Sequence, residues 1–221
     1  PRNYPRMRSS FRVHRAAGAI GCPVVEIGVP FSDPVADGPA IQRASQAALE
    51  RGMTLRRSLD WVAAAREAGA RPVLMTYLNP ILRMEPEAFA RTAAEAGCAG
   101  VIVPDLGYEE SDALRALLAA AGLTLVDLVA PTTPDDRLAR IAGPAAGFLY
   151  LVAVTGVTGT RSPVSDQLDA FAARVRRETD LPLYAGFGID GPARAVEAAA
   201  VCDGVIMGSA LLRCFLDEDT T

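Results

Sequence analysis

The chain has 221 residues, half of them hydrophobic, and a formal net charge of -4 at pH 7. This length suits one large α/β domain, so we predict a single domain over residues 1–221. Acidic residues outnumber basic ones, and the sequence has no cluster of basic residues that would neutralise phosphates along a duplex. Both facts argue against a nucleic-acid partner. The sequence has no run of about eighteen apolar residues and no signal-peptide segment, so we expect a cytoplasmic protein that does not contact a membrane.

The 22 residues counted as lysine or arginine are all arginine. Schiff-base aldolases, pyridoxal phosphate enzymes and Walker-type ATPases use a lysine nitrogen, so their usual chemistry is excluded. The single histidine, His14, falls in a predicted helix, which argues against His-rich metal sites and Ser-His or Cys-His pairs. We therefore expect no cofactor, and acid and base catalysis falls to Asp, Glu, Tyr or Cys.

The four cysteines are scattered, without CxxC spacing, in apolar contexts. We expect buried, reduced thiols rather than disulfides or a zinc site. They are Cys22, Cys98, Cys202 and Cys214.

The first predicted elements are a helix over residues 9–19, a buried strand from Val24, and two helices over residues 40–51 and 54–68. Gly52 ends the first helix of that pair, and Thr54 caps the second.

Six further apolar runs then alternate with Ala- and Arg-rich amphipathic segments, which is typical of parallel βα crossovers. The runs cover residues 72–77, 100–103, 123–129, 147–152, 182–185 and 204–207. Glycine at the C-cap precedes several of them, at Gly69, Gly97 and Gly122. With the opening strand, the sequence predicts seven strands.

A doubly wound open sheet and a (β/α)8 barrel short of one strand both fit this order. An open nucleotide-binding sheet usually has GxGxxG after its first strand, and this chain does not. A barrel places its chemistry at the strand C-terminal ends and its phosphate site after the last strands. Acids follow the early strands and glycines the late ones, so we predict the barrel.

The stretch from Val24 to Pro39 holds two acids in unlike settings. Glu26 is flanked by β-branched residues in a strand, and Asp37 lies on the loop that follows. We expect a raised pKa for Glu26 and an ionised Asp37, a common division of acid and base roles. The alternative is a buried Glu26 paired with an arginine, and Asp37 as a turn former or helix N-cap.

Three late strands run into glycine-rich ends. Their bare backbone N–H groups, and the helix N-terminus after Gly208, suit a phosphate without any lysine. Each glycine taken singly is also compatible with a plain turn. The loop over residues 155–165 is a predicted lid, because it combines glycines and threonines without apolar periodicity.

The segment VEIGVPFSDPVADGP resembles the signature of the tryptophan synthase α subunit family. Three later segments, FLYLVAVTGVTGTR, YAGFGI and IMGSAL, resemble later motifs of that family in order and spacing. The resemblance implies a barrel that cleaves indole-3-glycerol phosphate to indole and glyceraldehyde 3-phosphate, by a cofactor-free retro-aldol reaction in tryptophan biosynthesis. It also implies a tryptophan synthase β subunit as partner, in an α2β2 assembly.

The resemblance assigns roles residue by residue. Glu26 and Asp37 match the catalytic carboxylates: Glu26 as the proton shuttle, and Asp37 as the acceptor of the indole N–H. The substrate-binding matches are Tyr77, Tyr150 and Thr158, and the phosphate-binding matches are Gly159, Gly188, Gly208 and Ser209. Pro30, Asp33 and Asp105 match positions near the partner subunit, and are otherwise loop turn formers.

Three departures from the family pattern limit these expectations. The family has a strand before Asn3 and a longer helix beyond Ser209, so we expect a (β/α)8 TIM barrel without those two elements. Either this sequence is part of a longer one, or the barrel is closed in another way, for example by a partner. In the predicted lid, Val154 replaces a charged residue. Two alternatives to the α-subunit reading follow: a stand-alone lyase that releases indole, and a non-catalytic scaffold that binds phosphate or the β subunit.

Overall fold

The computed structural model describes residues 22, 24–152, 163–186 and 188–217. The predicted helix over residues 9–19 and most of the predicted lid lie outside these ranges. Contacts divide the chain into two compact units: described residues up to Ala36 together with residues 44–125, and residues 37–43 together with those from Val126 onward. The prediction of a single domain stays a prediction.

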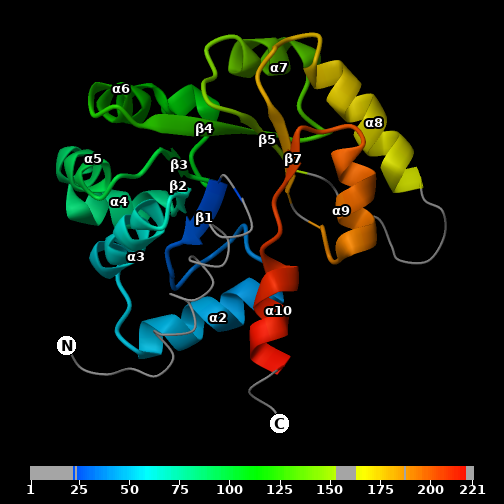
Figure 1. The fold of residues 1–221 in the computed structure, drawn as a ribbon. Coiled ribbons are helices and arrows are strands. Elements are labelled where there is room, and N and C mark those ends of the chain that lie inside the picture. Colours follow the sequence, from blue (N-terminus) through cyan, green and yellow to red (C-terminus); the bar gives the residue numbers. More distant parts are fainter. Residues whose placement is uncertain (1–21, 23, 153–162, 187, 218–221) are drawn as a thin grey trace. The chain divides into compact units, whose positions relative to one another are not determined.

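Three parallel strands organise the first unit: β1 (Val24–Gly28), β2 (Arg71–Met75) and β3 (Gly100–Ile102). Helices α3 (Leu55–Glu67), α4 (Leu78–Met84), α5 (Pro86–Glu95) and α6 (Asp112–Ala120) lie along one side of these strands (Figure 1). A short 3-10 helix, η1 (Tyr108–Glu110), precedes α6. The core between strands and helices is apolar and includes fully buried Leu74, Phe89 and Val101.

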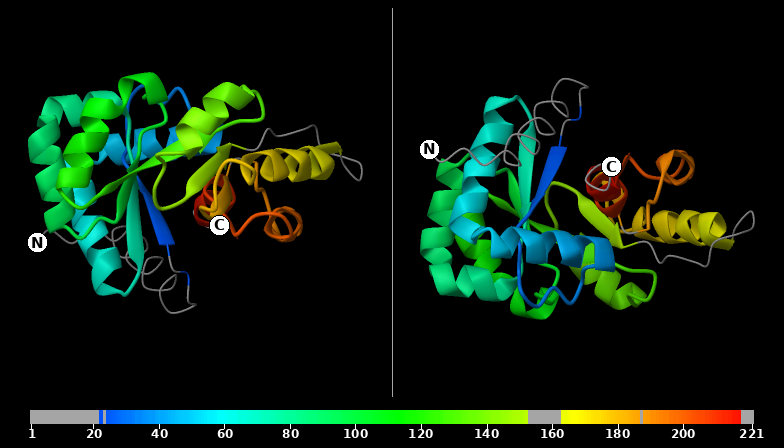
Figure 2. Two further views of the ribbon diagram at one scale, coloured as in Figure 1. Left: turned by 90° about the horizontal axis from the view of Figure 1, so that it is seen from above. Right: turned by 90° about the horizontal axis from the view of Figure 1, so that it is seen from below.

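The second unit holds most of strand β4 (Thr124–Val129), with β5 (Leu149–Val152), β6 (Leu183–Gly186) and β7 (Gly204–Val205). Paired neighbours β4 to β7 are again parallel. Its helices are α7 (Asp135–Ala142), α8 (Pro163–Val175), α9 (Pro192–Ala199) and α10 (Ser209–Asp217) (Figure 2). Helix α2 (Pro39–Glu50) begins in this unit and continues into the first. Strand order follows chain order from β1 to β7, so the seven predicted strands are confirmed.

The ends of the helices follow local rules. Thr54 has extended backbone angles, and its side chain accepts a hydrogen bond from Arg57 N at 3.3 Å, as expected of an N-cap. Gly69, Gly97 and Gly122 have φ of 89°, 81° and 77°, a left-handed conformation that glycine adopts without strain. The predicted glycine caps are confirmed, and each turns the chain from a helix into the next strand.

The cysteines are free where the structure describes them. Cys98 and Cys202 are buried, and burial raises the pKa of both thiols, to about 11 for Cys202. The prediction is wrong for Cys22, which is exposed because it lies before β1, outside the helix-covered core. The side chain of Cys214 lies outside the described part. No helix within the described ranges is both long and apolar enough to cross a bilayer.

Candidate functional site

Glu26 lies in the middle of β1, on the face turned away from the helices. Val25, Ile27 and Val29 pack into the helix-covered core, so the alternation of a strand places Glu26 on the opposite face. Its register partner on β2 is Val73, which is buried. The Glu26 side chain is half-buried, and its Oε2 atom is inaccessible to solvent. One oxygen of this carboxyl group is therefore shielded from solvent, and its catalytic role stays a prediction.

The loop between β1 and α2 carries Asp37, which is half-buried. Gln42 on the first turn of α2 donates from Nε2 to Asp37 O at 2.8 Å and from its backbone N to Gly38 O at 3.0 Å. These bonds fix the Asp37 peptide to the start of the helix. The predicted difference in pKa between Glu26 and Asp37 stays a prediction.

The same loop carries two residues predicted near a partner. Pro30 is half-buried, whereas Asp33 is exposed and accepts a hydrogen bond from Ser32 Oγ at 2.5 Å. Beside them Val35 is 83% exposed, the most exposed large apolar side chain among the described residues. The tip of this loop therefore presents an apolar and acidic surface to solvent.

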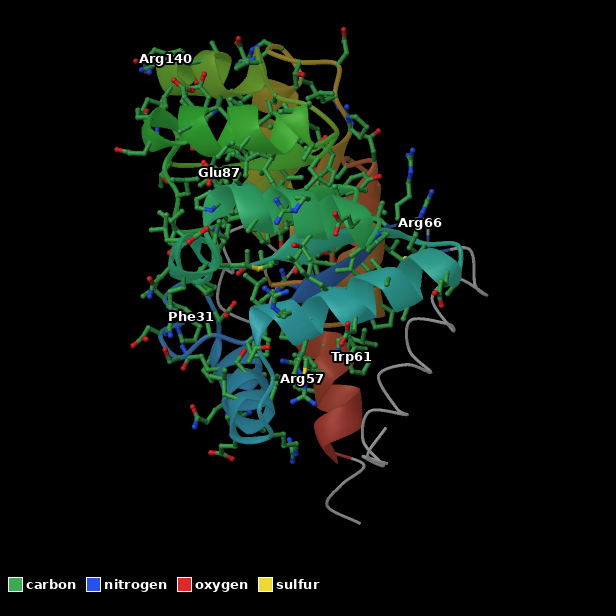
Figure 3. All side chains as sticks on the ribbon, turned by 90° about the vertical axis from the view of Figure 1, so that its left-hand side faces the viewer. Phe31, Arg57, Trp61, Arg66, Glu87 and Arg140 are labelled. Carbon is green, nitrogen blue, oxygen red and sulfur yellow. The ribbon has the colours of Figure 1, made fainter. Side chains whose placement is uncertain are left out.

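Tyr77 follows β2 and is buried, with 3% of its surface exposed. Its hydroxyl accepts a hydrogen bond from Ala36 N at 3.0 Å. Its ring stacks on Phe31, with centroids 5.1 Å apart and planes 28° apart. Phe31 lies on the loop between β1 and α2 (Figure 3). Tyr77 thus touches the loop that carries Asp37 at two places.

Asp105 follows β3, and its Oδ1 atom accepts a hydrogen bond from Leu78 N at 2.9 Å. Leu78 is the first residue of α4, so this carboxylate satisfies one of the amides that a helix leaves free at its start. Asp105 is exposed. It therefore orders the peptide directly after Tyr77, and its predicted place near a partner stays a prediction.

In the second unit Tyr150 lies on β5 and is buried, with 3% exposed. Gly186 ends the neighbouring strand β6, and a Cβ atom on it would overlap the Tyr150 ring. Because Gly186 has no side chain, the Tyr150 ring has room to lie across the end of β6. Tyr184, two residues earlier, stacks on Phe148 with centroids 4.6 Å apart.

The predicted phosphate glycines follow β6 and β7. Gly188 has a φ of +78° and is half-buried. Gly208 is exposed and Ser209 begins α10, with Leu212 N donating to Gly208 O at 3.0 Å. A Cβ atom at Gly208 would meet Ile41 Cδ1 at 3.8 Å, so the segment after Asp37 lies beside this helix start. Thr158 and Gly159 lie outside the described residues.

The residues described hold no group of three or more His, Cys, Asp or Glu side chains that could bind a metal ion. The family model "Tryptophan synthase alpha chain" matches residues 2–220. The chain belongs to the tryptophan synthase alpha chain family.

Relatives support the assignment over most of the chain. A tryptophan synthase alpha chain from Roseiflexus sp. is 48% identical over 211 residues, which is 95% of this chain and 81% of that protein. The alpha chain from Carboxydothermus hydrogenoformans is 46% identical over 209 residues, 94% of this chain and 78% of that one.

Solved structures of tryptophan synthase alpha chains are also similar to this chain. Tryptophan synthase from Mycobacterium tuberculosis is similar with a TM-score of 0.84 at 40% identity, over 94% of this chain and 79% of that one. The alpha subunit from Campylobacter jejuni gives 0.85 at 33% identity, over 94% and 84%. The fold is accordingly that of the TIM barrels of this family, with seven parallel strands among the described residues. The chain is a lyase of the tryptophan synthase alpha type, with the alpha-subunit role in tryptophan biosynthesis.

Sequence reasoning missed three features of this tryptophan synthase alpha chain. The stacking of Phe31 on Tyr77 and the packing of Tyr150 over Gly186 join residues far apart in sequence, so no local pattern indicates them. Asp127 is a carboxylate buried in β4, only 6% exposed. Its signal was available, since it interrupts the apolar run TLVDLV as Glu26 interrupts β1.

Proposed function

We propose that this alpha chain cleaves indole-3-glycerol phosphate to indole and glyceraldehyde 3-phosphate, with Glu26 and Asp37 as its catalytic carboxylates. The observation that carries the proposal is Glu26, whose Oε2 atom is closed to solvent on the face of β1 turned away from the helices. A carboxyl group in such surroundings holds and returns a proton more readily than one in water. This property is what a proton shuttle needs.

The reaction breaks the bond between C3 of the indole and its side chain. The bond breaks when C3 gains a proton and the adjacent side-chain hydroxyl loses one, and we assign this transfer to Glu26. Asp37 accepts the indole N–H and stabilises the positive charge that develops on the ring in the transition state. No metal or cofactor takes part in these steps.

The phosphate binds at the backbone N–H groups of the glycine-rich ends after β5, β6 and β7. Gly188, with its left-handed backbone, and Gly208, at the start of a helix, support this assignment. Ser209 and Gly159 complete the proposed phosphate site. Tyr77, Tyr150 and Thr158 line the rest of the substrate. Binding of the phosphate holds the bond to be broken in a fixed position relative to Glu26 and Asp37. This positioning supplies much of the rate acceleration that acid and base catalysis do not.

The proposed partner is the tryptophan synthase β subunit, in an α2β2 assembly that receives the indole. Similar solved structures are described as tryptophan synthase. The exposed loop tip around Asp33 and Val35 supports a docking role for the segment from Pro30, and Asp105, after β3, is exposed as well. A cytoplasmic location also stays a prediction.

Indole release from indole-3-glycerol phosphate, measured with and without β subunit, tests the proposal. Glu26→Gln and Asp37→Asn should each lower kcat by about 10² to 10⁴, because each removes a proton-transfer or charge-stabilising group. Matched controls are Glu87→Gln and Asp136→Asn, since both acids are exposed on helices outside the site. Full activity of Glu26→Gln would overturn the assignment of the proton shuttle.

A further inference from the structure

Tyr77 is connected to the Asp37 loop by a hydrogen bond that spans 41 residues of sequence. The donor is Ala36 N and the acceptor is the Tyr77 hydroxyl, at 3.0 Å. Ala36 N belongs to the peptide that joins Val35 to Ala36, so this bond fixes the peptide plane one residue before Asp37. A backbone amide in a loop otherwise finds water as its partner, which leaves its orientation free.

The Tyr77 end of this connection is held firmly. Thr76 N donates to Ile102 O at 3.0 Å, which extends the β2–β3 ladder to the residue before Tyr77. Leu78 N donates to Asp105 Oδ1 at 2.9 Å, which fixes the peptide after it. Hydrogen bonds therefore hold the backbone on both sides of Tyr77, and its buried ring cannot swing with the loop.

The loop end is the part that needs to be held. Its tip is in solvent, with Val35 83% exposed and Asp33 exposed. Phe31, near the start of the loop, stacks on the Tyr77 ring at 5.1 Å. Tyr77 thus contacts the loop at its start through the ring and at its end through the hydroxyl.

We infer that Tyr77 is a positioning residue for Asp37: its hydroxyl, bound to the amide of Ala36, sets the position of the Asp37 carboxylate. This role is separate from lining the substrate, and it rests on the proposed function of Asp37. Misplacement of a catalytic group by about 1 Å can lower the rate on the order of 10²-fold. Loss of one neutral hydrogen bond displaces the loop in only part of the population.

Tyr77→Phe removes the hydroxyl and keeps the ring that stacks on Phe31. We expect kcat for indole release to fall on the order of tenfold, with KM changed less than about twofold, because the chemistry and not substrate binding is affected. In the Asp37→Asn background the same substitution should lower kcat no further. Tyr108→Phe is the matched control, since Tyr108 lies in η1, outside the proposed site, and should leave kcat unchanged.

Phe31→Leu tests the other contact and leaves the hydroxyl in place. It should lower kcat about threefold, less than Tyr77→Phe, because the ring contact supports the loop start and not the peptide before Asp37. This second variant also keeps the inference testable if Tyr77→Phe does not fold. Full kcat in both variants, or a rise in KM alone, would overturn the positioning role.

Amide hydrogen exchange of Ala36, measured by NMR, tests the connection without any activity. Exchange should be about fivefold or more faster in Tyr77→Phe than in the wild type, which corresponds to the loss of one hydrogen bond, and unchanged in Tyr108→Phe. If the wild type releases no indole, the proposed function fails. Unchanged Ala36 exchange in Tyr77→Phe overturns the inference whether or not indole is released.

Discussion

The two units of this alpha chain prepare their parts of the proposed site by opposite means. In the first unit, hydrogen bonds to side chains order the loops: Tyr77 binds the amide of Ala36, and Asp105 binds the amide of Leu78. In the second unit the absence of a side chain matters, as at Gly186, where the Tyr150 ring occupies the space of a Cβ atom.

The roles proposed for the two units account for this difference. Positioning a carboxylate that moves protons requires a fixed geometry, which directional side-chain hydrogen bonds provide. Binding a phosphate and a flat ring requires close approach of backbone, which only glycine allows. Substitutions at Asp37 and at the first-unit residues of the proposed site should therefore act mainly on kcat, and substitutions at Tyr150 and the glycines of the second unit mainly on KM.

The largest expected effect comes from moving the Glu26 carboxylate without removing it. Glu26→Asp keeps the carboxyl group and shortens the side chain by one methylene, so the carboxyl group withdraws from its position on the β1 face. We expect kcat to fall on the order of 10²-fold, with KM nearly unchanged. Steady-state indole release measures both constants. An active Glu26→Asp enzyme would mean that geometry in the first unit is less strict than its hydrogen bonds suggest.

Gly186→Ala breaks the arrangement in the second unit. The added Cβ atom meets the Tyr150 ring at both its hydroxyl and its carbons, so the ring must move or β6 must shift. We expect KM for indole-3-glycerol phosphate to rise about 10- to 100-fold while Glu26 keeps its surroundings. If Gly186→Ala binds substrate normally, the Tyr150 ring is not confined by that glycine.

The contrast between the units also explains what the sequence could predict. Strand positions, the Thr54 cap and the glycine caps follow from local patterns, and all seven strands are confirmed. Glu26 was predictable because a charge inside an apolar strand is unusual in itself. The contacts of Tyr77 with Ala36 and of Tyr150 with Gly186 were not, because each depends on which strands pair and in which register. The exposure of Cys22 was not predictable for a similar reason, because apolar neighbours in the sequence do not show whether a helix covers the residue.

Gly188 gives a smaller effect, through the backbone alone. Its φ of +78° is disfavoured for a residue with a Cβ atom, so Gly188→Ala should destabilise the fold by about 1 kcal/mol. If its N–H binds phosphate, the affinity for inorganic phosphate should fall several-fold as well. Gly191→Ala is the matched control, because Gly191 has an extended backbone and open space around its Cβ position. Calorimetry of unfolding and of phosphate binding separates the two effects.

The smallest effect is expected at Asp203, where the second unit uses side-chain hydrogen bonds. The Asp203 carboxylate accepts hydrogen bonds from Leu183 N at 2.8 Å and from Arg176 Nη2 at 2.5 Å, at the amino-terminal end of β6. The Leu183 amide, and then Arg176, lower the pKa of Asp203. A group with a lowered pKa in the folded state stabilises the fold above its unfolded pKa of about 3.9, and this stabilisation is lost as the pH falls through the folded value.

Asp203→Asn should therefore lower the free energy of unfolding at pH 7 by at most about 1 kcal/mol, because the side chain is 44% exposed and solvent screens the pair. The difference between wild type and variant should shrink as the pH falls below about 4 and disappear once Asp203 is protonated in the folded state, in urea unfolding followed by circular dichroism. Indole release should not change, because the amino-terminal ends of barrel strands contribute stability rather than chemistry. A loss of activity in a fully folded Asp203→Asn enzyme would instead connect this end of the unit to the glycines that follow β6 and β7.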